Sequence, residues 1–78
     1  MYTFLIELQK RPDGLINSSV TARSSLATGL ALYYDRASKA VTSTQFTGVA
    51  LTLTDEDGNI IENRHFDTLY EPEEVSEE

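Results

Sequence analysis

The sequence predicts an α+β fold of the ββαββ type, in which a four-stranded antiparallel sheet carries one helix packed on one face. Three observations predict it. Two pairs of apolar segments are each joined by an Asp-Gly turn, a central segment changes to a helical period, and 78 residues allow one domain only. We assign residues 1–68 to this domain and residues 69–78 to a flexible acidic tail.

The first two strands form a hairpin. Residues 2–9 alternate between apolar and polar side chains, with Leu5 as the apolar exception. The apolar positions on one face are Tyr2, Phe4, Ile6 and Leu8. Residues 12–14 (Pro-Asp-Gly) form a turn, and the second strand covers residues 15–23. Its apolar positions are Ile16, Val20 and Ala22. A short turn between two such segments favours direct antiparallel pairing.

Residues 26–41 predict one amphipathic helix of about four turns. Its apolar stripe consists of Leu26, Leu30, Tyr33, Ala37 and Val41. Ser24 and Ser25 precede it, and a serine oxygen at this position accepts a hydrogen bond from a free amide of the first turn. Gly29 lies inside the helix, where glycine is destabilising, so we expect a close approach of the helix to the sheet there.

The last two strands form a second hairpin over residues 45–54 and 60–66, with the turn at residues 55–59. Because one helix covers one face of the sheet, we expect the opposite face to be open and rich in threonine. The expected residues of that face are Thr3, Glu7, Asn17, Ser19, Thr21, Thr52 and Thr54. The pattern leaves the strand order undetermined. Both the open face and an edge strand are surfaces to which a partner can bind.

The sequence contains no recognisable reaction centre, so we expect a protein that is not an enzyme. There is no cysteine, which excludes disulfides and thiolate chemistry. His65 is the only histidine, and it lies in a predicted strand without a nucleophile pattern around it. The chain has no Gly-rich phosphate loop. We therefore expect no bound cofactor.

The acidic turn at residues 55–59 shares only some positions with a calcium-binding loop. With Gly58 at the sixth position of such a loop, Leu53 takes the first ligand position and Arg64 takes the place of the bidentate glutamate. Neither side chain can bind a cation. We therefore expect no metal site.

Acidic residues concentrate in the last third of the chain, which has a net charge of −7. Residues 1–54 carry five basic and three acidic side chains, a balance of +2, whereas residues 55–78 carry one basic and ten acidic side chains, a balance of −9. Such a field repels nucleic acids and membrane surfaces and attracts basic protein surfaces. We therefore expect a protein partner with a basic surface, and no direct binding to nucleic acid or to a membrane.

The location predicted from the sequence is the cytoplasm. The apolar run at the N-terminus ends at Glu7, too early for a signal peptide, and no stretch approaches the roughly 20 apolar residues that span a bilayer. A domain this small without cysteine is typical of a reducing compartment.

Two functional hypotheses follow. The first is a small non-enzymatic protein-binding module, such as an inhibitor of the phage or mobile-element type, that presents an acidic surface to a basic, nucleic-acid-binding protein. Its candidate partner-binding residues are Asp55, Glu56, Asp57, Glu62, Asp67 and Tyr34. The alternative is a structural or assembly protein that self-associates, as a homodimer, through its open sheet face or an edge strand. The acidic tail also has a simpler interpretation, which is that it keeps the protein soluble.

Overall fold

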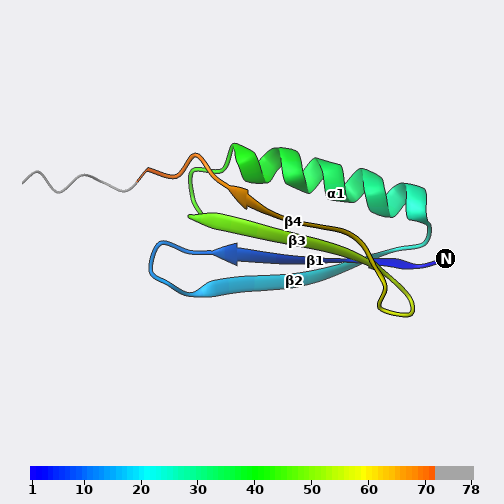
Figure 1. The fold of residues 1–78 in the computed structure, drawn as a ribbon. Coiled ribbons are helices and arrows are strands. Elements are labelled where there is room, and N and C mark those ends of the chain that lie inside the picture. Colours follow the sequence, from blue (N-terminus) through cyan, green and yellow to red (C-terminus); the bar gives the residue numbers. More distant parts are fainter. Residues whose placement is uncertain (72–78) are drawn as a thin grey trace, which may run out of the picture.

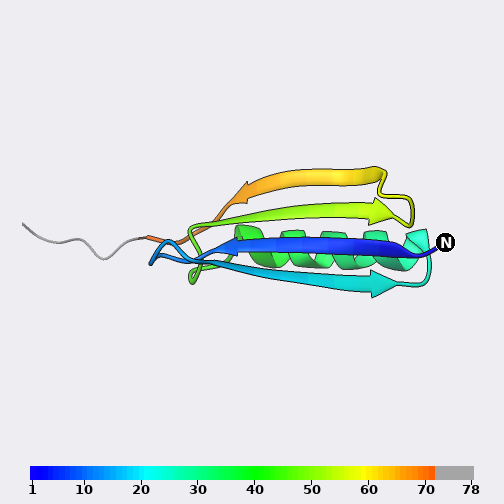
Figure 2. The same ribbon diagram turned by 90° about the horizontal axis from the view of Figure 1, so that it is seen from below.

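The computed structural model describes residues 1–71 and confirms the ββαββ fold. Its elements are β1 (Thr3–Lys10), β2 (Ile16–Arg23), α1 (Leu26–Val41), β3 (Gly48–Asp55) and β4 (Ile60–Asp67). Neighbouring strands are antiparallel, in the order β2-β1-β3-β4. The helix lies along the strands on one face of the sheet (Figure 1). Figure 2 views the sheet from the opposite side, where no described element covers it. Most of the predicted tail, residues 72–78, lies outside the described residues.

Both hairpin turns use the chemistry that the sequence predicts. Gly14 and Gly58 have φ angles of 92° and 85°, a conformation that other residues rarely adopt. Asp13 accepts a hydrogen bond from the backbone N–H of Leu15 (3.0 Å) in the first turn. Each hairpin is therefore closed by an aspartate and a glycine.

The helix begins at Leu26 and ends at Val41, as its period predicts. Oγ of Ser25 accepts a hydrogen bond from the backbone N–H of Thr28 (3.2 Å), so Ser25 is the N-cap. The buried helix residues are Gly29, Tyr33 and Ala40. Leu26 and Val41, which we predicted in the buried stripe, are 38% and 42% exposed because they lie in the terminal turns of the helix.

Gly29 is a point of close approach between helix and sheet, as predicted. A Cβ atom on this residue would lie 2.1 Å from Oγ1 of Thr3, much closer than two such atoms can approach. The same Oγ1 atom donates a hydrogen bond to the carbonyl oxygen of Ser25 (3.1 Å). The absence of a side chain at Gly29 therefore lets α1 pack directly on the first residue of β1.

The core lies between α1 and the two central strands, β1 and β3, with a contribution from β4. Its buried apolar residues are Leu5, Tyr33, Ala40, Val49, Leu51, Leu53 and Phe66. Leu51 and Leu53 are completely buried, so β3 turns its apolar positions toward the helix. Leu5 of β1 lies directly opposite Leu53. Because residues directly opposite each other in antiparallel strands point to the same side of a sheet, Leu5 also faces the helix.

In this register the side of β1 that we predicted to face solvent instead faces the helix. Thr3 and Glu7, which we predicted on the open face, are buried beneath the helix, with 0% and 8% of their surface exposed. The β2 residues that share this side of the sheet are Asn17, Ser19 and Thr21. For these five residues the prediction is wrong, because alternation within one strand does not show which of its sides pairs with the apolar side of its neighbour. Thr52 and Thr54 do lie on the open face, as predicted.

The open face is the side of the sheet that the helix does not cover. Its residues, in matching order from one end of the sheet to the other, are Ala22, Val20, Ser18 and Ile16 of β2; Phe4, Ile6, Leu8 and Lys10 of β1; Thr54, Thr52, Ala50 and Gly48 of β3; and Ile60, Asn63, His65 and Asp67 of β4. The residues in the same place of each group form one row across the four strands. Most of the β1 and β2 members are apolar, which is the opposite of the threonine-rich face that we predicted.

We predict that Gly29→Ala lowers the free energy of unfolding by about 1–3 kcal/mol, although alanine is a better helix former than glycine by about 1 kcal/mol. The added methyl group collides with Thr3 and pushes the helix off the sheet. Urea unfolding followed by circular dichroism measures the change. The control is Ser38→Ala at an exposed position of the same helix, with an expected change below about 0.5 kcal/mol. An unchanged stability of Gly29→Ala would contradict the close approach.

Candidate interaction surface

An apolar strip occupies the half of the open face that β1 and β2 form. It consists of Phe4, Ile6, Leu8, Ile16, Val20 and Ala22. Val20 and Ile16 are 65% and 60% exposed, and Leu8 is 41% exposed. Ile6 lies directly opposite Val20 in the ladder between the two strands, so their side chains meet on this face. The strip is therefore a contiguous apolar surface that no described part of the chain covers.

The other half of the open face, formed by β3 and β4, is mostly polar but carries little charge. The Thr52 hydroxyl donates a hydrogen bond to Oδ1 of Asn63 (3.1 Å) at the centre of this half. With histidine counted as neutral, the charged residues of the whole open face are Lys10 and Asp67, which lie in the same end row. Their charges cancel. The open face is thus neutral in a protein whose net charge is −7.

A hollow of about 170 Å³ opens in this face, and we call it the sheet hollow. Its lining residues are Leu8, Lys10, Ile16, Gly48, Ala50 and His65. The hollow exists because Gly48 and Ala50, toward one end of the central strand β3, carry almost no side chain. The His65 ring lies beside it, since a Cβ atom on Gly48 would be 3.0 Å from Nε2 of His65.

The open face resembles protein–protein interfaces in its composition. The buried centre of a protein–protein interface is depleted of charged residues, and a large exposed apolar patch on a folded domain marks an interaction site. Sequence reasoning identified the apolar alternation of β1 but interpreted it as core. The alternation does identify the apolar side of β1, but only the pairing with β3 shows that this side faces away from the helix.

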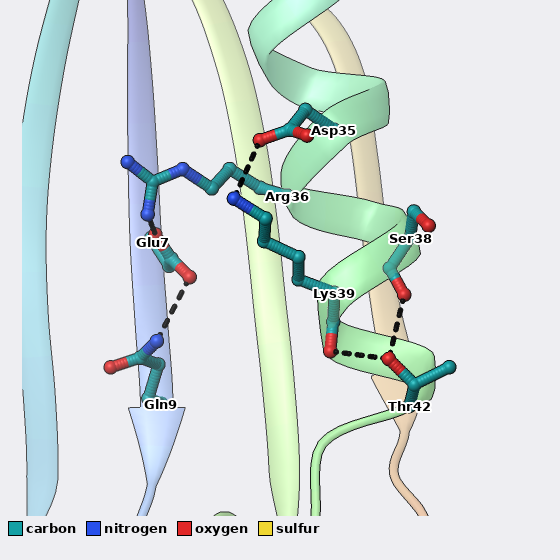
Figure 3. Close-up of polar contacts among 7 residues, drawn as sticks. All are labelled: Glu7, Gln9, Asp35, Arg36, Ser38, Lys39 and Thr42. Atoms are coloured by element: carbon teal, nitrogen blue, oxygen red, sulfur yellow. Dashed lines mark hydrogen bonds and ion pairs between the residues drawn. The ribbon is translucent and has the colours of Figure 1, made fainter.

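A second hollow, of about 330 Å³, lies on the covered side of the sheet between β1 and the C-terminal half of α1, and it is polar. It is built around Glu7, whose side chain is only 10% exposed. Oε1 of Glu7 lies 3.5 Å from a terminal guanidinium nitrogen of Arg36, and Oε2 accepts a hydrogen bond from Nε2 of Gln9 (3.0 Å) (Figure 3). The carboxylate therefore has one partner from its own strand and one from the helix.

The contact between Glu7 and Arg36 ties the helix to the sheet. A buried carboxylate is unfavourable unless it is paired, and Arg36 supplies the opposite charge. The pairing is incomplete, because Nε of Arg36 is buried without a hydrogen-bond partner among the described residues. Sequence reasoning missed this pair, since it placed Glu7 on the solvent side and no local spacing connects the two residues.

The predicted acidic cluster at the β3–β4 turn is partly a structural element. The Asp55 carboxylate accepts hydrogen bonds from the backbone N–H groups of Asp57 and Asn59 (2.9 Å each) and from Nδ2 of Asn59 (3.0 Å). These bonds, above all the one from the Asn59 side chain, lower the pKa of Asp55. Oε1 of Glu56 accepts a hydrogen bond from the backbone N–H of Tyr2 (2.9 Å), and Asp57 is exposed. The structure thus keeps these three acids together, with Asp55 engaged in the turn.

The other predicted partner-binding residues lie elsewhere. Glu62 pairs with Leu53 and lies on the helix side of β4. Burial raises the pKa of Tyr33, and the Glu62 carboxylate adds to that rise. Asp67 pairs with Gly48 at the far end of the strand, on the open face. Tyr34 is 58% exposed on the helix, and its ring packs edge-to-face against the ring of the buried Tyr33, with ring centroids 5.4 Å apart.

The negative charge of the residues that the structure describes is smaller than that of the whole sequence. Residues 1–71 carry six basic and nine acidic side chains, a balance of −3. The remaining four acids lie outside the described residues: Glu73, Glu74, Glu77 and Glu78. Three acids among residues 1–71 also face cations, at the contacts of Arg11 with Asp13 (2.9 Å), Lys39 with Asp35 (3.2 Å), and Arg36 with Glu7.

Within residues 1–71 no group of three histidine, aspartate or glutamate side chains is arranged to hold a metal ion. The single helix of this part is neither long nor apolar enough to cross a membrane.

Comparison of the chain with protein-family models, with curated proteins and with solved structures finds no match. The functional argument therefore rests on the geometry of the molecule.

We predict that Arg36→Met lowers the free energy of unfolding by about 1–3 kcal/mol, because it leaves the Glu7 carboxylate buried beside an apolar side chain. The matched control is Lys39→Met, one turn away, whose partner Asp35 is exposed. Loss of an exposed pair of this kind changes stability by less than about 0.5 kcal/mol. Urea unfolding of both variants measures the difference. Equal effects would contradict the anchoring role of the pair.

We predict that Asp55 contributes to the acid sensitivity of the fold. Because its pKa is lower in the folded than in the unfolded state, the stability that it supplies is complete above 3.8, its ordinary pKa, and is lost as the pH falls through the folded value. Asp55→Asn should therefore reduce the stability difference between about pH 7 and about pH 3, as measured by urea unfolding at both. Asp57→Asn, in the same turn, is the control and should keep the wild-type difference.

Proposed function

We propose that the protein is a non-enzymatic assembly protein that forms a homodimer by packing its open face against that of a second copy. The observation that carries this proposal is the exposed apolar strip on the sheet face that the helix leaves uncovered. Burying such a strip removes apolar surface from water, which is the main favourable term in protein association. Two sheets pack face to face in this way about 10 Å apart, with their side chains interdigitated.

The size of the open face supports a stable contact. Four strands about 4.8 Å apart, each of eight residues at about 3.3 Å per residue, cover roughly 19 by 26 Å. The projected area is about 500 Å² for each copy, or about 1,000 Å² for two. Specific interfaces begin near about 1,000 Å² of total buried surface, and protruding side chains add to the projected value.

The charge distribution favours a second copy as the occupant. Two chains of net charge −7 repel each other, so they associate best through a surface without net charge. The open face meets this condition, since Lys10 and Asp67 cancel. A strongly basic partner gains little from this face, because Asp67 is its only carboxylate.

The open face is a better site for self-association than either edge of the sheet. The edge strands are β2 and β4, and a second copy that added a strand to β2 would still leave the apolar strip exposed. Face-to-face packing covers the strip in both copies at once.

The hypothesis of a basic partner stays a prediction. Its candidate residues are divided among the β3–β4 turn, the helix, and both sides of β4. Part of the acidic charge belongs to residues 72–78, so deletion of residues 71–78 separates the contribution of these acids from that of the second hairpin. Binding that depends on these acids should weaken steeply as salt is added.

We predict that the wild-type protein sediments as a dimer at about 100 μM and that Val20→Glu sediments as a monomer, because the new carboxylate must be buried in the contact. Val20 is 65% exposed, so the folded monomer should tolerate the change. The control is Val41→Glu, which adds the same charge at the end of the helix and should leave the dimer intact. A wild-type monomer at millimolar concentration would overturn the proposal.

A further inference from the structure

We infer that the two copies are related by a two-fold axis that runs across the strands, and that Phe4 of each copy packs into the sheet hollow of the other. This inference rests on the proposed homodimer and specifies its geometry. It follows from three features of the open face: the off-centre position of the apolar strip, the order of its rows, and the place of the sheet hollow.

The position of the strip selects the axis. When two identical sheets pack face to face, the two-fold axis lies in the plane between them. If that axis runs along the strands, the β1–β2 half of one copy meets the β3–β4 half of the other, so the apolar strip lies against Thr52, Thr54 and Asn63. If the axis runs across the strands, each strand meets its own counterpart in the opposite direction, and the strip lies against the strip. The second arrangement removes apolar surface from water on both sides.

The order of the rows then places Phe4. The open face has four rows, which β1 marks with Phe4, Ile6, Leu8 and Lys10. An axis through the middle of the sheet passes between the rows of Ile6 and Leu8. The row of Phe4 in one copy therefore lies against the row of Lys10 in the other, which contains Ile16 and Gly48. These three residues all line the sheet hollow.

The sheet hollow matches the side chain that meets it. Its volume is about 170 Å³, and an apolar cavity of about 150 Å³ is enough for benzene. Phe4 is the only aromatic residue of the open face besides His65, and its ring has the size and shape of benzene. The alkyl stem of Lys10 can lie along the ring while its ammonium group stays in water. Leu8 and Ala50 complete an apolar wall around the ring.

Phe4 and Ala50 provide a test because they are remote from each other within one copy. Ala50 pairs with Leu8, four residues along β1 from Phe4, which corresponds to about 13 Å. Substitutions that far apart are energetically independent within one chain. Coupling between them in the dimerisation constant therefore reports a contact between copies.

The experiment is a double-variant cycle on the full chain, with the dimer dissociation constant measured by sedimentation equilibrium. Phe4→Ala empties the sheet hollow and Ala50→Leu fills it, so each should weaken dimerisation by about ten-fold or more. In the double variant the leucine occupies the space that the ring leaves. If the two substitutions acted independently, the dissociation constant of the double variant would be the wild-type constant multiplied by both single fold-changes. We expect the measured constant to be lower than this value by about five-fold or more. Circular dichroism checks each fold, and Ala50→Val replaces Ala50→Leu if the latter does not fold.

A second pair tests the other axis. With the axis along the strands, Lys10 of one copy lies beside Asp67 of the other, so Lys10→Glu and Asp67→Lys together should restore dimerisation that each alone weakens. With the axis across the strands these residues do not meet, and we expect no such rescue.

The outcomes separate this inference from the proposal on which it rests. A dimer in which the effects of Phe4→Ala and Ala50→Leu multiply independently overturns the geometry and leaves the homodimer standing. Rescue by the Lys10 and Asp67 pair also overturns it, in favour of the other axis. A wild-type chain that stays monomeric at millimolar concentration overturns both. Coupling of Phe4 with Ala50 without the charge rescue supports both.

Discussion

The pairing of β1 with β3 is the contact on which the rest of the molecule depends. The large apolar residues of β3, which are Val49, Leu51 and Leu53, alternate along the strand and turn toward the helix. Leu5 lies opposite Leu53, so β1 turns the side that carries Leu5 in the same direction. A slip of one residue would bring Phe4 and Ile6 under the helix instead and expose the polar side of β1. The core, the buried polar residues and the open face all follow from this single register.

The helix is adapted to a covered side of β1 that is only partly apolar. Thr3 is accommodated because Gly29 has no side chain and the Ser25 carbonyl accepts its hydroxyl hydrogen bond. Glu7 is accommodated because Arg36 reaches it from the helix. Residues of α1 that look unusual in the sequence, a glycine in the first half and an arginine near the core, thus match particular residues of the strand beneath them.

The same register leaves the protein with apolar surface that one helix cannot cover. A chain of 78 residues buries a small fraction of its surface compared with larger domains, and within residues 1–71 a single helix covers one side of the sheet. In the homodimer that we propose, a second copy covers the other side of the sheet through a face on which the charges of Lys10 and Asp67 cancel. Stability and assembly would be linked in such a homodimer, because it would bury apolar side chains that are exposed in one chain.

The sequence by itself determined the kinds of element, the helix limits at Leu26 and Val41, the two Asp-Gly turns and the close approach at Gly29, because each depends on residues near one another in the chain. The strand order, the side of β1 that faces the helix, the pairing of Glu7 with Arg36 and the apolar open face were decided only by the tertiary structure. The acids of the second hairpin, close in sequence, likewise proved to lie on different sides of the sheet. Alternation shows that a strand has two different sides, whereas the side that becomes core depends on its neighbours, which lie far away in the chain.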